Sequence, residues 1–190
     1  ILGGVMGTIQ GAGPHTNIYN REGGDITVNL TKSVGNLVVG GVTTKFQDSS
    51  DTVENHGDIN ISGTYEGSIY MAGLVTYSNN YTRNKHVNYG NFTISSATIG
   101  SALIVGGMCS YGPYGKTWTE AHNYGDITVE ADVEVSNGAY IGGMQGYFDS
   151  SSGNPTYTRS VNSGNIAYKG KIGVSTVAPN SSSYNKTHNL

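Results

Sequence analysis

The sequence predicts an all-β protein, a parallel β-solenoid built from about five repeats of roughly 35 residues. Three observations support this fold. Two short motifs alternate along the chain and keep their phase, the residues after one motif alternate between apolar and polar, and no stretch has the apolar spacing of a helix. The 29 glycines and 4 prolines also suit many short strands joined by tight turns.

The first motif is Asn-x-Gly followed by Asp or Asn. Its glycines are Gly24, Gly57, Gly90, Gly125 and Gly164, so successive copies are 33, 33, 35 and 39 residues apart. Its asparagines are Asn55, Asn88, Asn123 and Asn162, and the first copy reads Glu22-Gly23-Gly24 instead. If equivalent residues stack, these asparagines form a column whose amide side chains hydrogen-bond from turn to turn. We interpret the repeated glycine as a left-handed turn residue, which tolerates no Cβ.

The residue after each of these glycines is an acid or an amide. The column reads Asp25, Asp58, Asn91, Asp126 and Asn165. Stacked carboxylates would repel one another, whereas an amide between two acids can donate hydrogen bonds to both. The column is therefore predicted to stabilise the turn. Calcium binding is the alternative, but one oxygen ligand per turn is far below the number that calcium takes.

A predicted strand follows this turn in every copy. Its apolar positions are Ile26, Ile59, Phe92, Ile127 and Ile166, and two residues later Val28, Ile61, Ile94, Val129 and Tyr168. The residues between them are Thr27, Asn60, Thr93, Thr128 and Ala167. This alternation predicts one buried and one exposed face. Because a unit with two or more short strands cannot bury its apolar face alone, equivalent strands are expected to stack on one another.

The second motif is a pair of small residues inside an apolar stretch. The pairs are Gly3-Gly4, Gly40-Gly41, Ala72-Gly73, Gly106-Gly107 and Gly142-Gly143. A glycine pair in a strand indicates a bend or a close backbone approach. A phosphate-binding loop is disfavoured because no Lys-Ser/Thr follows. Together the motifs place a repeat array at 1–174, with repeats near 1–40, 41–72, 73–106, 107–142 and 143–174, before a polar tail or the start of a further repeat at 175–190.

The sequence Gly-Gly-apolar-x-Gly followed by Gly-Asp-Ile-x-Val resembles the GLUG-type repeats of large bacterial surface proteins, including those of Bacteroidetes. Gly3-Gly4-Val5-Met6-Gly7 and Gly142-Gly143-Met144-Gln145-Gly146 match the first element best. Ala72 replaces one glycine, and Thr44, Thr76 and Ser110 replace the last one. The resemblance implies display on a cell surface and a binding or spacing role, and it supplies no catalytic residue.

Ligand binding is expected in the segments that vary in length, namely 46–54, 77–87, 111–122 and 147–161, which we interpret as loops along one edge. They carry the predicted binding residues Tyr77, Tyr81, Tyr111, Tyr114, Trp118 and Tyr157. A row of exposed aromatic side chains suits a glycan or protein ligand. The alternative is that these side chains close over the ends of the core. Asp51-Thr52-Val53 resembles an O-glycan acceptor motif of Bacteroidetes, with Thr52 as the acceptor.

Composition argues against several other functions. Only 12% of residues are charged and the net charge is −3, so nucleic-acid binding and attraction to lipid surfaces are disfavoured. No apolar run is long enough to insert into a membrane. The single cysteine, Cys109, cannot form an internal disulfide and is interpreted as a semi-buried thiol. His86 and His122 are expected on adjacent turns, but two histidines without a third ligand make a poor zinc site, and we expect neither metal nor cofactor.

Together with these exclusions, the resemblance to GLUG-type repeats implies a non-catalytic module of an extracellular, bacterial cell-surface protein, acting as an adhesin or a rigid spacer. Its expected partners are host or microbial glycans, surface proteins and further repeats of a longer chain, since Ile1 starts within a repeat-like motif. A carbohydrate-active β-helix enzyme and a phage tail-fibre segment remain as alternatives. The enzyme would need paired carboxylates on neighbouring turns, whereas the outward strand residues are mostly Thr, Asn and Ala. Ice binding is disfavoured because Asn60 and Ala167 interrupt the threonine row.

Overall fold

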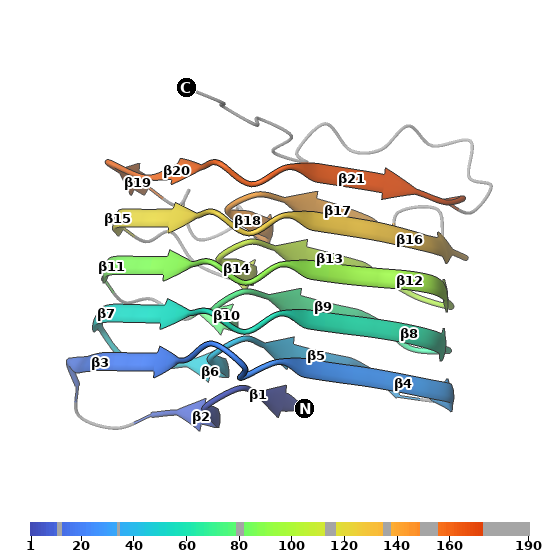
Figure 1. The fold of residues 1–190 in the computed structure, drawn as a ribbon, viewed down its shortest axis with the longest axis horizontal. Coiled ribbons are helices and arrows are strands. Elements are labelled where there is room, and N and C mark those ends of the chain that lie inside the picture. The colour runs from blue at the N-terminus through green and yellow to red at the C-terminus, as the bar shows by residue number, and fades with distance from the viewer. Residues whose placement is uncertain are drawn as a thin grey trace.

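The chain folds as a parallel β-solenoid, which confirms the predicted fold class (Figure 1). The computed structural model describes residues 1–10, 13–33, 35–78, 82–112, 117–134, 138–148 and 156–172. Within these ranges every regular secondary-structure element is a β-strand. Figure 1 shows the turns stacked on one another, with the first turn at the bottom and the strands running across the stack. Among the described residues, no helix is long and apolar enough to cross a bilayer.

Each turn contributes one strand to each of four parallel sheets, which we name A to D, except that the fifth turn contributes two short strands to sheet C. Sheet A contains β1 (Leu2–Gly3), β5 (Leu37–Gly40), β9 (Ile69–Ala72), β13 (Leu103–Gly106) and β17 (Ala139–Gly142). Sheet B contains β2 (Met6–Ile9), β6 (Thr43–Phe46), β10 (Val75–Ser78), β14 (Cys109–Gly112) and β18 (Gln145–Phe148). Sheet C contains β3 (His15–Asn20), β7 (Ser50–Asn55), β11 (Arg83–Asn88), β15 (Thr117–Asn123), β19 (Thr156–Thr158) and β20 (Val161–Asn162). Sheet D contains β4 (Ile26–Ser33), β8 (Ile59–Tyr65), β12 (Phe92–Ile99), β16 (Ile127–Val133) and β21 (Ile166–Lys169).

One sequence repeat is thus one full turn of four strands. From the second turn on, the strands of sheet C lie almost entirely within the segments that the sequence predicted to be loops, and for those residues the loop prediction was wrong. The reason is one residue per turn in the left-handed region, with φ between 49° and 56°, at Asn17, Thr52, Lys85, Glu120 and Arg159. This residue adds a second outward position, so the inward residues are spaced by three and then by two. A search for period-two alternation does not recognise such a strand.

Two separate hydrophobic clusters fill the solenoid. The first lies between sheets A and D and contains the predicted isoleucine-rich column, with Ile59, Phe92 and Ile127 fully buried. The second lies between sheets B and C and includes Phe46, Leu74, Met108 and Trp118. Threonines of the outward column, such as Thr27 and Thr128, are exposed as predicted. The alternation along the sheet D strands therefore gives the correct buried face.

An asparagine column separates the two clusters. The Nδ2 of Asn20, Asn55, Asn88 and Asn123 each donates to Oδ1 of the next asparagine, ending at Asn162, over 2.7–2.8 Å. The same Nδ2 atoms, and that of Asn162, also donate to the carbonyl oxygens of Gly24, Gly57, Gly90, Gly125 and Gly164. Asn20 is a member that the sequence analysis missed, because in the first turn it lies four residues before the glycine rather than two.

The glycine of the first motif and the second glycine of each pair are required because a Cβ at these positions would overlap the neighbouring turn or the asparagine column. Gly57, Gly90, Gly125 and Gly164 do not have a left-handed φ, so the turn-residue interpretation was wrong. A Cβ added to Gly57 would instead overlap the Gly24 carbonyl oxygen of the previous turn. The second glycine of each Gly-Gly pair lies across the interior from the asparagine column, and a Cβ on Gly41 would lie 2.6 Å from Cγ of Asn55. The corner between sheets A and B therefore approaches the corner between sheets C and D.

The Asp/Asn column stabilises the C–D corner through hydrogen bonds that each turn donates to the preceding turn. Oδ1 of Asp25, Asp58, Asn91 and Asp126 accepts the backbone N–H of the equivalent residue in the next turn, over 2.7–3.0 Å. The amides of Asn91 and Asn165 add a second bond, each to the acid of the preceding turn only. These bonds agree with the predicted turn-stabilising role, except that each amide serves one acid rather than two.

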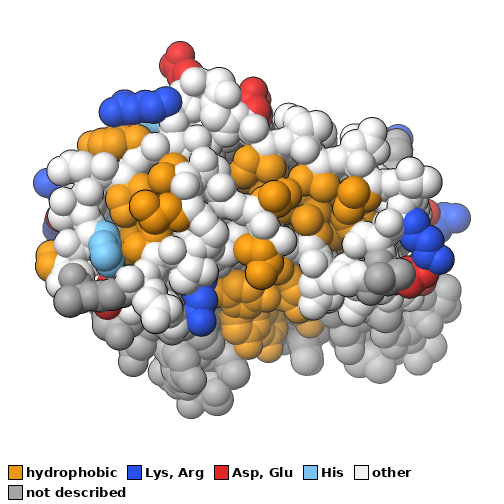
Figure 2. Space-filling view, turned by 90° about the horizontal axis from the view of Figure 1, so that it is seen from below, with side chains coloured by type: hydrophobic (Ala, Val, Ile, Leu, Met, Phe, Trp, Pro, Cys, Tyr) orange, Lys and Arg blue, Asp and Glu red, His pale blue; other side chains and the backbone are white. Residues whose placement is uncertain are grey.

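At the lower end of the solenoid, the first turn leaves hydrophobic side chains exposed whose equivalents in later turns are buried. Figure 2 views the molecule from below, where hydrophobic side chains gather near the middle of the face. Leu2, Val5 and Met6 are 41%, 39% and 50% exposed, whereas their equivalents one turn later, Val39, Val42 and Thr43, are fully buried. Covering by a neighbouring turn is what buries these positions, as expected for a fold whose units cannot bury their own apolar faces.

Candidate binding surfaces

The structure separates the predicted binding residues into three groups. Tyr77 in β10 and Tyr111 in β14 are half-buried and lie outside both hydrophobic clusters. Trp118 in β15 and Tyr157 in β19 belong to the second cluster. Tyr81 and Tyr114 lie outside the described residues. Four of the predicted residues can therefore be placed, and they do not form one surface.

Trp118 and Tyr157 are packing residues in this structure. Trp118 is 2% exposed, stacks with Tyr157 at a centroid distance of 6.2 Å and meets His86 edge-on. The Tyr157 hydroxyl donates to Oε1 of Gln145 over 2.8 Å, and burial raises the pKa of Tyr157 well above its ordinary value. For these two side chains the alternative interpretation, closure over the core, describes the geometry. The Trp118 ring has no exposed face to offer a ligand.

Tyr77 and Tyr111 belong to a larger group that we call the tyrosine cluster, which comprises Tyr70, Tyr77, Tyr111, Tyr140 and Tyr147. Strand pairing aligns Tyr77, Tyr111 and Tyr147 in one column of sheet B. Tyr70 and Tyr140 reach them from sheet A, at centroid distances of 5.6 Å to Tyr77 and 5.1 Å to Tyr147. The cluster therefore joins three successive turns across the A–B corner.

The rings of the cluster overlap only in part. Tyr111 and Tyr147 are nearly parallel, at 18°, with centroids 5.3 Å apart, which exceeds the ~3.5–4 Å contact distance of stacked carbon atoms. Burial, and then the neighbouring Tyr70 and Tyr111, raise the pKa of Tyr77 to about 12. The hydroxyl of Tyr77 therefore keeps its proton at neutral pH and remains a hydrogen-bond donor.

A second group of rings lies on the C–D corner, and we call it the His–Tyr stack. It comprises His56, Tyr89 and Tyr124, which occupy the middle position of the Asn-x-Gly motif in three successive turns. The centroid distances are 4.6 Å between His56 and Tyr89 and 5.3 Å between Tyr89 and Tyr124. Sequence reasoning missed this stack because it treated the motif as purely structural. The ring-bearing middle position was the signal that could have found it.

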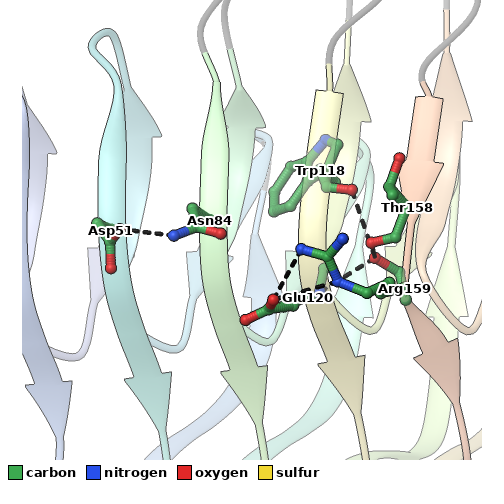
Figure 3. A network of polar contacts seen from close by, with 8 residues as sticks. Asp51, Asn84, Trp118, Glu120, Thr158 and Arg159 are labelled. Atoms are coloured by element: carbon green, nitrogen blue, oxygen red, sulfur yellow. Dashed lines mark hydrogen bonds and ion pairs between the residues drawn. The ribbon is translucent and has the colours of Figure 1, made fainter.

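The outer face of sheet C beside this stack is polar, and Figure 3 shows part of it. Nδ2 of Asn84 donates to Oδ2 of Asp51 over 2.6 Å, and the Arg159 guanidinium forms an ion pair with Glu120 at 2.8 Å. The Thr52 hydroxyl donates to Oδ1 of Asp51 over 2.7 Å. The predicted glycan acceptor is thus part of strand β7, at a left-handed φ of 55°, rather than in a loop.

The interior of the second cluster holds a serine–histidine contact. His86 Nδ1–H donates to the Asn84 carbonyl oxygen, so the Ser50 hydroxyl donates a hydrogen bond to Nε2 of His86 over 2.9 Å. Ser50 and His86 are 3% and 1% exposed, and burial lowers the pKa of His86 to about 3. Cys109 is buried in the same cluster, where desolvation raises the pKa of its thiol to about 12. None of these groups lies where a substrate could reach it.

Metal binding finds no support in the described parts of the chain, which contain no group of three His, Cys, Asp or Glu side chains arranged to hold an ion. His86 and His122 do lie on adjacent turns, but His86 pairs with Ala121 and His122 with Val87, so the two rings are out of register. In comparisons with known proteins, no family model, curated protein or solved structure matches this chain.

Proposed function

We propose that this chain is a non-catalytic repeat module of a bacterial cell-surface protein that binds a glycan or protein through the tyrosine cluster. The observation that carries the proposal is the continuous run of five half-buried tyrosines across three turns of the A–B corner. Tyrosine combines a large apolar ring with a polar hydroxyl and has few rotatable bonds, so it contributes strongly to binding at low entropic cost.

The resemblance of the two motifs to GLUG-type repeats supports display on a cell surface. The ladder of buried asparagines supports a rigid module, since each turn is hydrogen-bonded to the next through side chains as well as backbone. A rigid rod that carries the tyrosine cluster over three successive turns suits an extended ligand, and it also suits a spacer between other domains.

The proposal is tested by screening the purified chain against arrays of glycans and host matrix proteins. The decisive variant is Tyr77→Ala/Tyr111→Ala, with Thr93→Ala/Thr128→Ala on the outer face of sheet D as a matched control. Loss of binding in the first variant alone is expected. Binding that survives the tyrosine substitutions would refute the assignment of the site, and turnover of any glycan would refute the non-catalytic role.

A further inference from the structure

The His–Tyr stack offers ring surface that the fold itself does not use. Tyr89 and Tyr124 are 45% and 47% exposed, and their planes differ by only 13°. Their 5.3 Å centroid distance means that the two rings overlap in part, so each leaves a strip of its face uncovered. Turn five has Ser163 at the equivalent position, so among the described residues the column of rings at the middle position of the motif ends at Tyr124. The stack therefore presents stepped aromatic surface along the solenoid axis.

Hydrogen-bonding groups flank these rings. His122, in the sheet C strand just before the corner of the fourth turn, is half-buried and lies against Tyr124 at a centroid distance of 6.0 Å. Its Nδ1 is buried and has no hydrogen-bond partner among the described residues. In the second turn, at the other end of the stack, Oε2 of Glu54 contacts Nε2 of His56 at 2.9 Å. Aromatic rings bordered by polar side chains are suited to sugars, because the apolar face of a sugar ring packs on the aromatic ring while its hydroxyls reach the polar groups.

Charge around the stack favours an uncharged ligand. Four acids, Asp51, Glu54, Glu120 and Glu22, share the outer face of sheet C and the C–D corner with three basic residues, Arg21, Lys85 and Arg159. The Asp/Asn column next to the stack adds further acids at the corner. This surface has no excess of positive charge, so it would not attract an acidic polymer.

We propose that the His–Tyr stack, with His122 beside it, is a binding platform for a neutral glycan that runs along the solenoid axis. Successive turns are ~4.8 Å apart, which is close to the length of one sugar unit, so consecutive sugars meet Tyr89 and Tyr124 in turn. The platform lies on the C–D corner, on the opposite side of the asparagine column from the tyrosine cluster. It is therefore a site distinct from that cluster, and one module can hold two ligands at once.

The test measures binding of cello-, xylo-, manno- and chito-oligosaccharides of increasing length, with oligogalacturonate as the acidic probe, by calorimetry. Tyr89→Ala/Tyr124→Ala removes both rings and Tyr89→Phe/Tyr124→Phe keeps them. Thr93→Ala/Thr128→Ala on the outer face of sheet D is the matched control, and Tyr77→Ala/Tyr111→Ala reports separately on the tyrosine cluster. Circular dichroism establishes that each variant keeps its strands, which is expected because both rings are outside the asparagine ladder.

We expect at least one neutral series to bind, with affinity rising until the oligomer spans both rings. The Tyr89→Ala/Tyr124→Ala variant should bind about tenfold or more weakly, and the phenylalanine variant and the Thr93→Ala/Thr128→Ala control should keep most of the affinity. Failure of every neutral series, binding unchanged in the Tyr89→Ala/Tyr124→Ala variant, or a preference for oligogalacturonate would each overturn the platform. Loss confined to Tyr77→Ala/Tyr111→Ala would overturn it too, while supporting the tyrosine cluster as the site.

Discussion

Replacing Asn88 by aspartate tests whether the buried asparagine column holds the turns together. Asn88 is fully buried at the centre of the column, and its Nδ2 donates to the Gly90 carbonyl oxygen over 2.8 Å and to Oδ1 of Asn123 over 2.7 Å. Aspartate has nearly the same shape but no amide hydrogens. A protonated carboxyl can replace one of the two donated bonds, whereas an ionised carboxylate can replace neither.

The expected loss of stability depends on pH. With the carboxyl protonated, one acceptor is left without a partner, which costs about 1–3 kcal/mol. Burial against two oxygen atoms raises the folded-state pKa of the introduced carboxyl above its unfolded value near ~3.9. As pH rises, the carboxyl therefore loses its proton first in the unfolded state. Above the unfolded-state pKa, the free energy of unfolding of the variant falls by a further ~1.4 kcal/mol per pH unit until the folded-state pKa is reached. The deficit grows from acid to neutral pH.

The assay is urea unfolding from pH 4 to pH 8, followed through Trp118, which is the one tryptophan of the chain and is buried. The quantity compared is the difference between Asn88→Asp and the parent at each pH, so titrations common to both proteins cancel. Asn162→Asp is the matched control, because Asn162 is at the end of the column and its Nδ2 donates to Gly164 alone among the described residues. A difference for Asn88→Asp that does not change with pH would refute the reasoning.

Three further predictions concern other buried or strained groups. Thr52→Asn should stabilise the fold by about 1 kcal/mol in thermal or urea unfolding, because a β-branched residue at a left-handed φ is strained and Asn17 already occupies the equivalent position. Lys85→Asn is the comparison, because lysine is not β-branched, and a gain for Thr52→Asn no larger than that for Lys85→Asn would contradict the prediction. His86 has a pKa lowered to about 3, so the unfolded state takes up the proton first and stability should fall from about pH 6.5 downward by roughly 1.4 kcal/mol per pH unit. His86→Gln should flatten this slope, and an equally steep slope would assign it to other groups. Cys109, whose thiol pKa is raised to about 12 by burial, should react with a maleimide only as fast as the protein opens; fast labelling of the native protein would show that the second cluster is not closed.

The sequence predicted the sheet D side of the solenoid well because that side follows simple rules. Alternating residues such as Ile59 and Ile61 face the first cluster, and register follows from the repeated motif. Sheet C was missed because its left-handed residues, Thr52 among them, break the alternation. The repeated glycines were recognised as essential but for the wrong reason, since the close approach of neighbouring turns cannot be read from one strand alone.

The candidate site was less predictable for a related reason. An aromatic residue in a variable segment can face either way, and only the extra residue in sheet C decides that Trp118 points inward. Tyr77 and Tyr111 were found, whereas Tyr70 and Tyr140 were not, because their contact depends on how sheets A and B meet. Tertiary geometry, rather than residue type, separates packing aromatics from surface ones in this fold.

The two motifs keep phase because they contact each other across the interior, where the second glycine of each pair lies over an asparagine of the column. That contact fixes the glycine and the asparagine in every turn and leaves the residue between Asn and Gly unconstrained. The unconstrained position reads His56, Tyr89, Tyr124 and Ser163 in successive turns, and the turn with serine keeps the same asparagine and glycine bonds as the turns with rings. The rings of the His–Tyr stack are therefore not needed to form the corner, and exposed aromatic surface at a position that the fold leaves free is what a binding role predicts.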